Sequence, residues 1–318
     1  MSSREEGKSA LSDEYSETMK AKMGSTLVYK HEDGMNYARA SPRLFVGSCL
    51  QSSGDVEKLH GDKVGVIFCL QEDKDMAHFS LDIAPIQKRA AELGIKHVRE
   101  PITDFDPFSL RRRLPSAVRR LAQELLSRPE DESAYIHCTA GLGRAPGVAL
   151  AYMFWVDARC LDEAYASLFE VRRCHPQLGM IRAATCDMLA GEEGGLQSAR
   201  IAIAREGAST VQIAGLDVGW GNRLPLEKDA VTGQFVLTRG LPAGTYQYKF
   251  IVDGEWLACP ELPTVDDNGN LNNVLEVAPG PGSPDAERRS RIMASGGRPT
   301  EEEQASLQAQ LRGPAPSA

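Results

Sequence analysis

Short apolar runs alternate with longer amphipathic segments between residues 37 and 189. The runs at residues 43–48, 64–70, 95–101 and 134–138 have the length and composition of buried strands. Apolar residues recur with helical spacing at residues 82–93, 110–126, 145–158, 161–173 and 177–189. Strands that alternate with helices predict an α/β fold with a mostly parallel central sheet, flanked by helices on both faces.

The pattern changes after the sequence GEEGGLQSA at residues 191–199. The runs that follow are short, alternate apolar with polar residues, and are separated by turn residues. Asp253-Gly254 between two of them is a strong hairpin signal. This alternation predicts a small all-β, immunoglobulin-like sandwich of antiparallel strands. A Pro/Gly-rich stretch comes next, and then a polar segment suited to a helix, residues 300–312.

These patterns divide the chain into five parts. We expect a flexible N-terminal segment (1–25), an α/β domain (26–190), a linker (191–198), the all-β sandwich (199–278), and a linker with a helical tail (279–318). A chain of 318 residues is long enough for two modest domains.

Composition and charge exclude several classes of function. The formal net charge of −8 argues against a wide basic face for nucleic acid, and no apolar run is long enough to cross a bilayer. The N-terminus lacks the apolar core of a secretory signal, and five acidic residues in its first 20 positions are atypical of a transit peptide. Seven scattered cysteines without a CxxC pair predict reduced thiols, with neither a metal site nor a disulfide framework.

The sequence YIHCTAGLGRAP at residues 135–146 joins a predicted buried strand to a predicted helix. Backbone N–H groups at such a turn face inward, at the positive end of the helix dipole, and form an anion site. Gly141 and Gly143 let the backbone curl closely, and Arg144 can hold two phosphate oxygens in a fork. The predicted phosphate-binding loop comprises His137, Thr139, Ala140, Gly141, Leu142, Gly143 and Arg144.

The positive end of the helix dipole and Arg144 also act on Cys138, which begins the Cys-x5-Arg pattern. Helix N-termini and nearby cations favour the thiolate, so Cys138 is expected to attack phosphorus and form a phosphocysteine. His137 is expected to orient the loop, because an ionised thiol needs no base. Asp104, 34 residues before Cys138, is the expected general acid, and Asp106 is a competitor that could equally cap the next helix.

The sequence HCTAGLGR resembles the signature of cysteine-based phosphatases of the dual-specificity branch. Many members carry Ser or Thr after the arginine, where the hydroxyl helps the thiolate to leave during hydrolysis. Ala145-Pro146 at this place resembles the plant and algal phosphoglucan phosphatases of the starch-excess type. The resemblance implies hydrolysis without metal or cofactor, and a hydrolytic step that depends more strongly on Asp104.

Two tryptophans of the predicted sandwich lie at turns, Trp220 between two glycines and Trp256 two residues after Gly254 of the hairpin signal. Exposed aromatic faces at turns suit stacking on sugar rings, and Lys249 could hydrogen-bond sugar hydroxyls, although each residue alone could equally be structural. The region resembles the family 48 carbohydrate-binding module. That resemblance adds Asn273 to the glucan contacts, with Asn272 as a possible substitute.

The resemblance to glucan phosphatases also implies aromatic walls around the loop. Tyr37, Phe79 and Phe105 would line the cleft, although core packing is an equal alternative for Tyr37 and Phe79. His78 and His175 would join them, and both stand where plant relatives more often show aromatic residues. The relatives further imply redox control, in which Cys69 forms a reversible disulfide with Cys138. A buried core thiol is the alternative for Cys69.

The combined prediction is a monomeric enzyme that removes phosphate monoesters from starch, amylopectin or another phosphorylated α-glucan. Two alternatives remain: a protein phosphatase of the dual-specificity type tethered to glucan, and a non-catalytic glucan-binding scaffold. A plastid stroma location at the starch granule is implied by resemblance alone, and the cytoplasm is the alternative.

Overall fold

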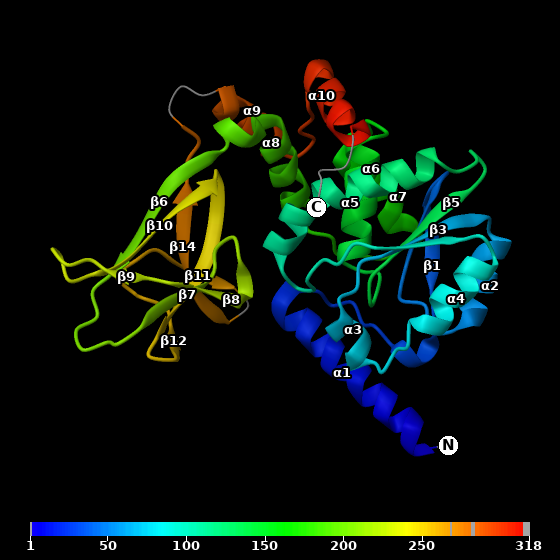
Figure 1. The fold of residues 1–318 in the computed structure, drawn as a ribbon, viewed down its shortest axis with the longest axis horizontal. Helices are drawn as coiled ribbons and strands as arrows, with labels where there is room; N and C mark the ends of the chain where they lie inside the picture. Colours follow the sequence, from blue (N-terminus) through cyan, green and yellow to red (C-terminus); the bar gives the residue numbers. More distant parts are fainter. Residues whose placement is uncertain (1, 268, 281–283, 314–318) are drawn as a thin grey trace. The chain divides into compact units, whose positions relative to one another are not determined.

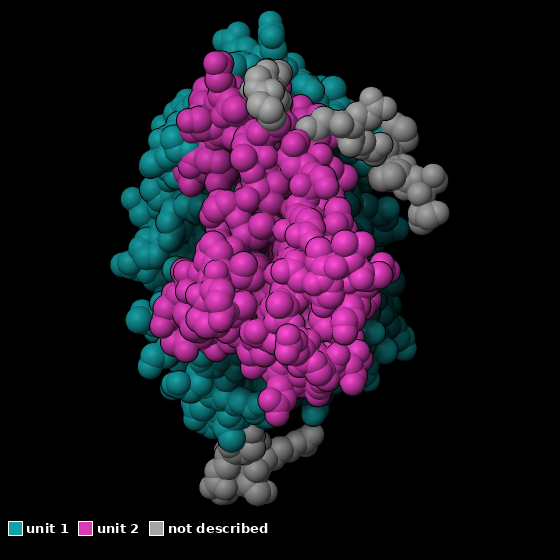
Figure 2. All heavy atoms as spheres, turned by 90° about the vertical axis from the view of Figure 1, so that its left-hand side faces the viewer, with its two compact units in different colours: residues 1–105, 110–181, 294–318 teal, residues 106–109, 182–293 magenta. Residues whose placement is uncertain are grey.

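A computed structural model describes residues 2–267, 269–280 and 284–313. The chain forms two compact units (Figures 1 and 2). The first comprises residues 1–105, 110–181 and 294–318, and the second comprises residues 106–109 and 182–293. Within the described residues, no helix has both the length and the apolar content needed to cross a membrane.

The first unit is built on a five-stranded sheet with the order β1-β2-β5-β3-β4. β1 is antiparallel to β2, and the other neighbouring pairs are parallel. This confirms the predicted mostly parallel sheet. The strands are β1 (Tyr37–Ser41), β2 (Leu44–Gly47), β3 (Val64–Cys69), β4 (Lys96–Arg99) and β5 (Ser133–His137).

Helices cover both faces of this sheet (Figure 1). Phe45, Ile67 and Tyr135 share one face and pack with apolar residues of α2 and α4. α6 is almost wholly buried, as its mostly apolar sequence requires. The helices of the α/β region are the short 3-10 helix η1 (His31–Asp33), α2 (Ser53–Gly61), α3 (Asp73–His78), α4 (Ala84–Glu92), α5 (Pro107–Leu126), α6 (Arg144–Trp155), α7 (Leu161–Val171) and α8 (Leu178–Gly194).

The N-terminal segment differs from the expected flexible lead-in. Residues Ser2–Met23 form one helix, α1, whose apolar residues Leu11, Tyr15 and Met19 recur every four positions. Leu11 and Tyr15 pack against a cluster that includes Phe79, and Met19 is 2% exposed. A stripe with this spacing lies on one side of a helix, so the segment is ordered by packing although most of its residues are polar.

The second unit contains a three-stranded and a six-stranded antiparallel sheet, as the alternating pattern predicts. Their inward side chains form one core that includes Ile213, Phe235, Tyr246 and Phe250. The strands are β6 (Leu196–Ile203), β7 (Val211–Gly215), β8 (Gly219–Pro225), β9 (Glu227–Lys228), β10 (Phe235–Pro242), β11 (Gly244–Val252), β12 (Glu255–Leu257), β13 (Thr264–Asp267) and β14 (Asn270–Val277).

The two predicted linkers contain regular structure. β6 begins at Leu196, and α9 (Pro284–Met293) occupies much of the stretch expected to be a linker. The tail helix is confirmed as α10 (Glu301–Arg312), with Thr300 as its N-cap. α10 belongs to the first unit, where Leu307 and Leu311 are buried.

Candidate functional site

The Cys-x5-Arg loop lies between the C-terminal end of β5 and the first turn of α6, as predicted. Gly141 adopts a φ of +68°, which a residue with a side chain rarely adopts, and its N–H donates to the Cys138 sulfur at 3.3 Å. Cys138 is only 2% exposed and Thr139 is 1% exposed. The sequence therefore folds into an enclosed loop around the sulfur, at the positive end of a helix.

Arg144 connects the loop to the predicted acid. Its guanidinium pairs with Asp104 at 2.6 Å and with Asp75 at 2.5 Å, and it also donates to the carbonyl of Ile102 at 2.9 Å. Burial raises the pKa of Asp104 above its ordinary value, while the charge of Arg144 opposes that shift. A buried carboxyl that holds its proton to higher pH is suited to donate it to a leaving oxygen.

Asp75 was not singled out from the sequence, although it pairs with Arg144. It occupies the first turn of α3, where it also accepts from the backbone N–H of Glu72 at 3.0 Å. Its only sequence signal is the acidic stretch EDKD at residues 72–75, which is more typical of a helix start. Asp106, the competitor of Asp104, accepts from the N–H groups of Phe108 and Ser109 and caps α5.

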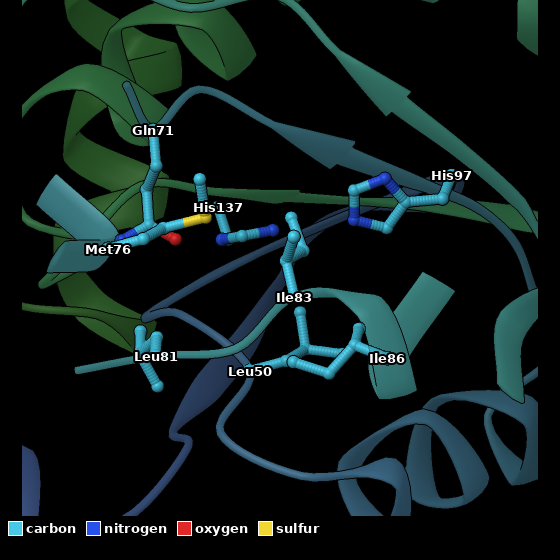
Figure 3. Close-up of a pocket in the computed structure, with 8 residues that line it drawn as sticks. All are labelled: Leu50, Gln71, Met76, Leu81, Ile83, Ile86, His97 and His137. Atoms are coloured by element: carbon cyan, nitrogen blue, oxygen red, sulfur yellow. The ribbon is translucent and has the colours of Figure 1, made fainter. Parts of the chain in front are cut away.

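His137 is buried at the end of β5, directly before Cys138, and is suited to orient the loop. Burial lowers the pKa of His137 to about 3 and that of His97 to about 4, so both rings are neutral at pH 7. The His137 Nδ1 lies 3.2 Å from the carbonyl oxygen of Cys138, to which it can donate. Figure 3 shows the two rings in a small pocket lined by Leu50, Gln71, Met76, Leu81, Ile83, Ile86, His97 and His137.

Aromatic side chains surround the loop on the side of α1. Tyr15 lies 5.9 Å from Phe79, 5.4 Å from Phe105 and 6.5 Å from His78, measured between ring centroids. The structure therefore brings Phe79, Phe105 and His78 together around a tyrosine that the sequence analysis missed. Phe79 is only 5% exposed and packs in a buried cluster, which is its core-packing alternative. The signal was present in the four-residue spacing of Leu11, Tyr15 and Met19.

Tyr37 is not part of this wall, so its predicted place in the cleft is wrong. Its ring packs against Phe45 and Tyr135, and its hydroxyl donates to Asp62 at 2.6 Å. Tyr37 lies in β1 and packs with the core beneath α2 and α4. His175 is exposed and contacts the loop through its backbone, since its N–H donates to the Leu142 carbonyl at 2.7 Å.

Tyr15 donates a hydrogen bond to Asp104 at 2.6 Å, and that bond lowers the pKa of the carboxyl. Replacing Tyr15 with Phe removes this donor, so Asp104 should hold its proton to higher pH. Because the general acid must be protonated, the alkaline limb of kcat/KM should move to higher pH. The pH profile of phosphate release from amylopectin checks this, because the sugar oxygen needs the proton of Asp104 to leave.

Tyr29→Phe is the matched control, because the Tyr29 hydroxyl contacts His31 and Cys49 instead of Asp104. If the alkaline limb of Tyr15→Phe stays in place or moves to lower pH, the assignment of Asp104 as the general acid held by Tyr15 is contradicted.

Two of the predicted sugar contacts, Lys249 and Trp256, lie on the outer face of the six-stranded sheet. Tyr246, Tyr248 and Phe250 of β11 point into the core, so Gln247 and Lys249 point outward. Ile251 lies on the same face as Lys249 but is only 1% exposed. Trp256 pairs with Ile251 and is 47% exposed, with the Arg223 guanidinium 5.9 Å from its ring centroid. Trp220 is half-buried in β8 of the same sheet.

Asn273 does not lie on this face. It is fully buried, with its side-chain oxygen accepting from the Cys259 N–H at 2.8 Å and its amide donating to the Cys259 carbonyl at 2.8 Å. Asn272 points the other way and donates to Gln247 at 2.6 Å. A shift of one residue along a strand exchanges the two faces, so Asn272 lies on the same face as Gln247, where it is 3% exposed.

All seven cysteines are free thiols in this structure, and all are buried. Cys69 ends β3 and pairs in register with His137, next to Cys138. Among the described residues, no group of three or more His, Cys, Asp or Glu side chains is arranged to hold a metal ion.

Comparison with known proteins identifies the family. The chain is 44% identical to phosphoglucan phosphatase DSP4, amyloplastic, from Castanea sativa over 271 residues, which cover 84% of this chain and 71% of the relative. The chain belongs to the phosphoglucan phosphatases. It is thus a cysteine-dependent phosphatase. It is also 28% identical to phosphoglucan phosphatase LSF1, chloroplastic, from Arabidopsis thaliana, covering 79% of this chain and 43% of the relative.

The second unit of this phosphoglucan phosphatase has a family match of its own. Residues 201–281 match the glycogen recognition site of AMP-activated protein kinase. Among solved structures, the Cydia pomonella PTP-2 phosphatase aligns with a TM-score of 0.37 and 19% identity, covering 52% of this chain and 92% of that one.

Proposed function

We propose that this phosphatase hydrolyses phosphate monoesters of α-glucan through a phosphocysteine on Cys138. The sulfur attacks phosphorus while Arg144 and the loop N–H groups hold the phosphoryl oxygens. Asp104 gives its proton to the departing sugar oxygen, and in the second step it takes a proton from the water that releases phosphate. Ala145 offers no hydroxyl to help the sulfur leave, so this second step depends on Asp104.

The observation that carries this proposal is the union of two sites in one chain. An intact Cys138, Asp104 and Arg144 set is joined to a sheet whose outer face exposes Trp256 beside Lys249. Holding the polymer raises the local concentration of its scattered phosphates. The names of the two relatives, amyloplastic and chloroplastic, support starch in a plastid as the setting, and we place the enzyme at the granule surface.

Release of phosphate from amylopectin, compared with a phosphotyrosine peptide and an aryl phosphate, tests the substrate. We expect the glucan to be preferred over the peptide in kcat/KM by about tenfold or more, because only the glucan engages both sites. Preference for the peptide would support a glucan-tethered protein phosphatase. Release from none of the substrates would support a scaffold and overturn the proposal.

Removing both tryptophan rings should weaken glucan binding. For Trp220→Ala plus Trp256→Ala we expect roughly a tenfold or greater loss of affinity for amylopectin, since each stacked ring contributes about 1 kcal/mol. Hydrolysis of a small aryl phosphate should be unchanged. Val231→Ala is the control, because Val231 is 94% exposed in the same unit. Unchanged sedimentation with amylopectin granules in the double variant would count against the binding face.

Two finer assignments extend the proposal. A reversible Cys69–Cys138 disulfide would block the nucleophile under oxidising conditions and protect it from further oxidation. Both thiols are buried and reduced in this structure. We further propose that the enzyme acts as a monomer, because each chain carries both sites.

A further inference from the structure

The backbone carbonyls of the catalytic loop are held from outside by hydrogen-bond donors. Two adjacent carbonyls share one side chain: Arg172 donates from Nη2 to Ala140 at 3.0 Å and from Nε to Gly141 at 2.8 Å. The carbonyls of the other three residues between Cys138 and Arg144 accept from backbone N–H groups, Thr139 from Cys49, Leu142 from His175 and Gly143 from Gly147, at 2.9, 2.7 and 3.0 Å.

These contacts fix the direction of the amide groups that face the anion. In a planar trans peptide the C=O and the following N–H point in opposite directions. Holding the Ala140 carbonyl outward therefore turns the Gly141 N–H inward, where it donates to the Cys138 sulfur at 3.3 Å. Holding the Gly141 carbonyl outward does the same for the N–H of Leu142. Gly141 would otherwise let both peptides rotate easily.

Arg172 is itself well placed for this contact. It caps the C-terminus of α7, where its N–H donates to Leu168 at 2.8 Å, and its Nη2 donates to the Asn36 side chain at 2.9 Å. A Cβ added to Gly141 would lie 2.3 Å from the backbone carbonyl of Gly47 and 2.6 Å from the Arg172 Nη2, so the absence of a side chain at residue 141 leaves room for both neighbours. The described residues provide no carboxylate partner for Arg172, in contrast to Arg144 with its two aspartates.

We propose that Arg172 is a positioning residue of this phosphatase, which orients the peptide planes on both sides of Gly141 toward the substrate phosphate. It acts through the backbone, and Arg144 remains the residue that grips the phosphate. This inference rests on the proposed phosphatase function. Loss of Arg172 leaves two buried carbonyls without donors, which favours rotation of those peptides and loss of the inward N–H groups.

Arg172→Met in the full chain tests the proposal. We expect kcat for an aryl phosphate to fall roughly tenfold to a hundredfold, in the range found when a preorganised donor is lost. Tungstate, as a phosphate probe, should bind roughly tenfold more weakly by calorimetry in a Cys138→Ser background. Arg172→Ala should regain part of its kcat when methylguanidine is added. The control is Arg173→Met, because Arg173 is exposed and lies over the Phe169 ring.

Arg172→Met that is folded by circular dichroism and keeps kcat and tungstate affinity within about twofold of the parent would overturn the inference. If Arg172→Met does not fold, Arg172→Lys tests the inference instead. Lysine keeps the positive charge but lacks the planar guanidinium that donates to both carbonyls. A roughly tenfold weaker tungstate affinity in Arg172→Lys supports the proposal, and an unchanged affinity overturns it. An unmodified enzyme that releases no phosphate from any substrate would instead contradict the proposed function.

Discussion

Replacing Cys138 with serine is expected to reduce phosphate release from amylopectin by at least about a thousandfold. A serine hydroxyl in this loop stays protonated at neutral pH, so the covalent intermediate cannot form at a useful rate. The loop amides and Arg144 remain in place, so the variant should still bind phosphate and glucan. Malachite-green detection of phosphate, together with glucan sedimentation, measures both properties.

Cys160→Ala is the matched control for this substitution. Cys160 is also a buried thiol, but it lies at the N-cap of α7 and takes no part in the loop. Its activity should stay within about twofold of the parent enzyme, since a small buried thiol contributes mainly packing. Phosphate release by Cys138→Ser at the parental rate would show that the nucleophile lies elsewhere.

The second large effect is expected for Asp104→Asn, which keeps the shape of the side chain but removes its proton. We expect kcat on amylopectin to fall roughly a hundredfold or more, because a sugar alkoxide is a poor leaving group without a proton donor. An aryl phosphate leaves readily without help, so its kcat/KM, which reports the first step, should be affected much less, although hydrolysis of the phosphocysteine still needs Asp104. The alkaline limb of the pH profile should disappear in the variant, since the group that loses its proton there is absent.

Asp106→Asn separates this role from helix capping. Asp106 caps α5 through the N–H groups of Phe108 and Ser109, and asparagine caps a helix nearly as well. We therefore expect near-parental activity for Asp106→Asn. If Asp106→Asn lost the alkaline limb and Asp104→Asn kept it, the acid would have to be reassigned.

The loop and the sheet could be predicted because residues close together in the sequence determine both. A buried strand, a glycine with positive φ and an arginine at the helix start occur within residues 133–144, so few arrangements are possible. The alternation of strands with helices likewise predicted a mostly parallel sheet, and β2, β5, β3 and β4 are parallel. Asp104 follows β4 and the loop follows β5, so both come after the C-terminal ends of parallel strands that are separated by β3 alone.

Other features depended on packing that composition obscures. Most residues of α1 are polar, and this composition is typical of a disordered segment. The helix is nevertheless ordered, because three apolar residues on one side pack against the first unit. Tyr37 was placed in the cleft by resemblance, but β1 directs it to the core beneath α2 and α4. Asn272 and Asn273 differ only in strand parity, and a sequence alone does not fix which of two adjacent residues faces inward.

The return of the chain to the first unit has a practical consequence for protein engineering. After the glucan-binding sheets, α10 supplies Gln304 and Gln308, which donate to the backbone carbonyls of Trp155 and Val156 at 2.7 and 3.0 Å. These carbonyls terminate the same helix whose opposite end carries Arg144. A recombinant fragment that stops at residue 190 would leave this terminus uncapped, so a catalytic fragment needs α10 reattached through a short artificial connection.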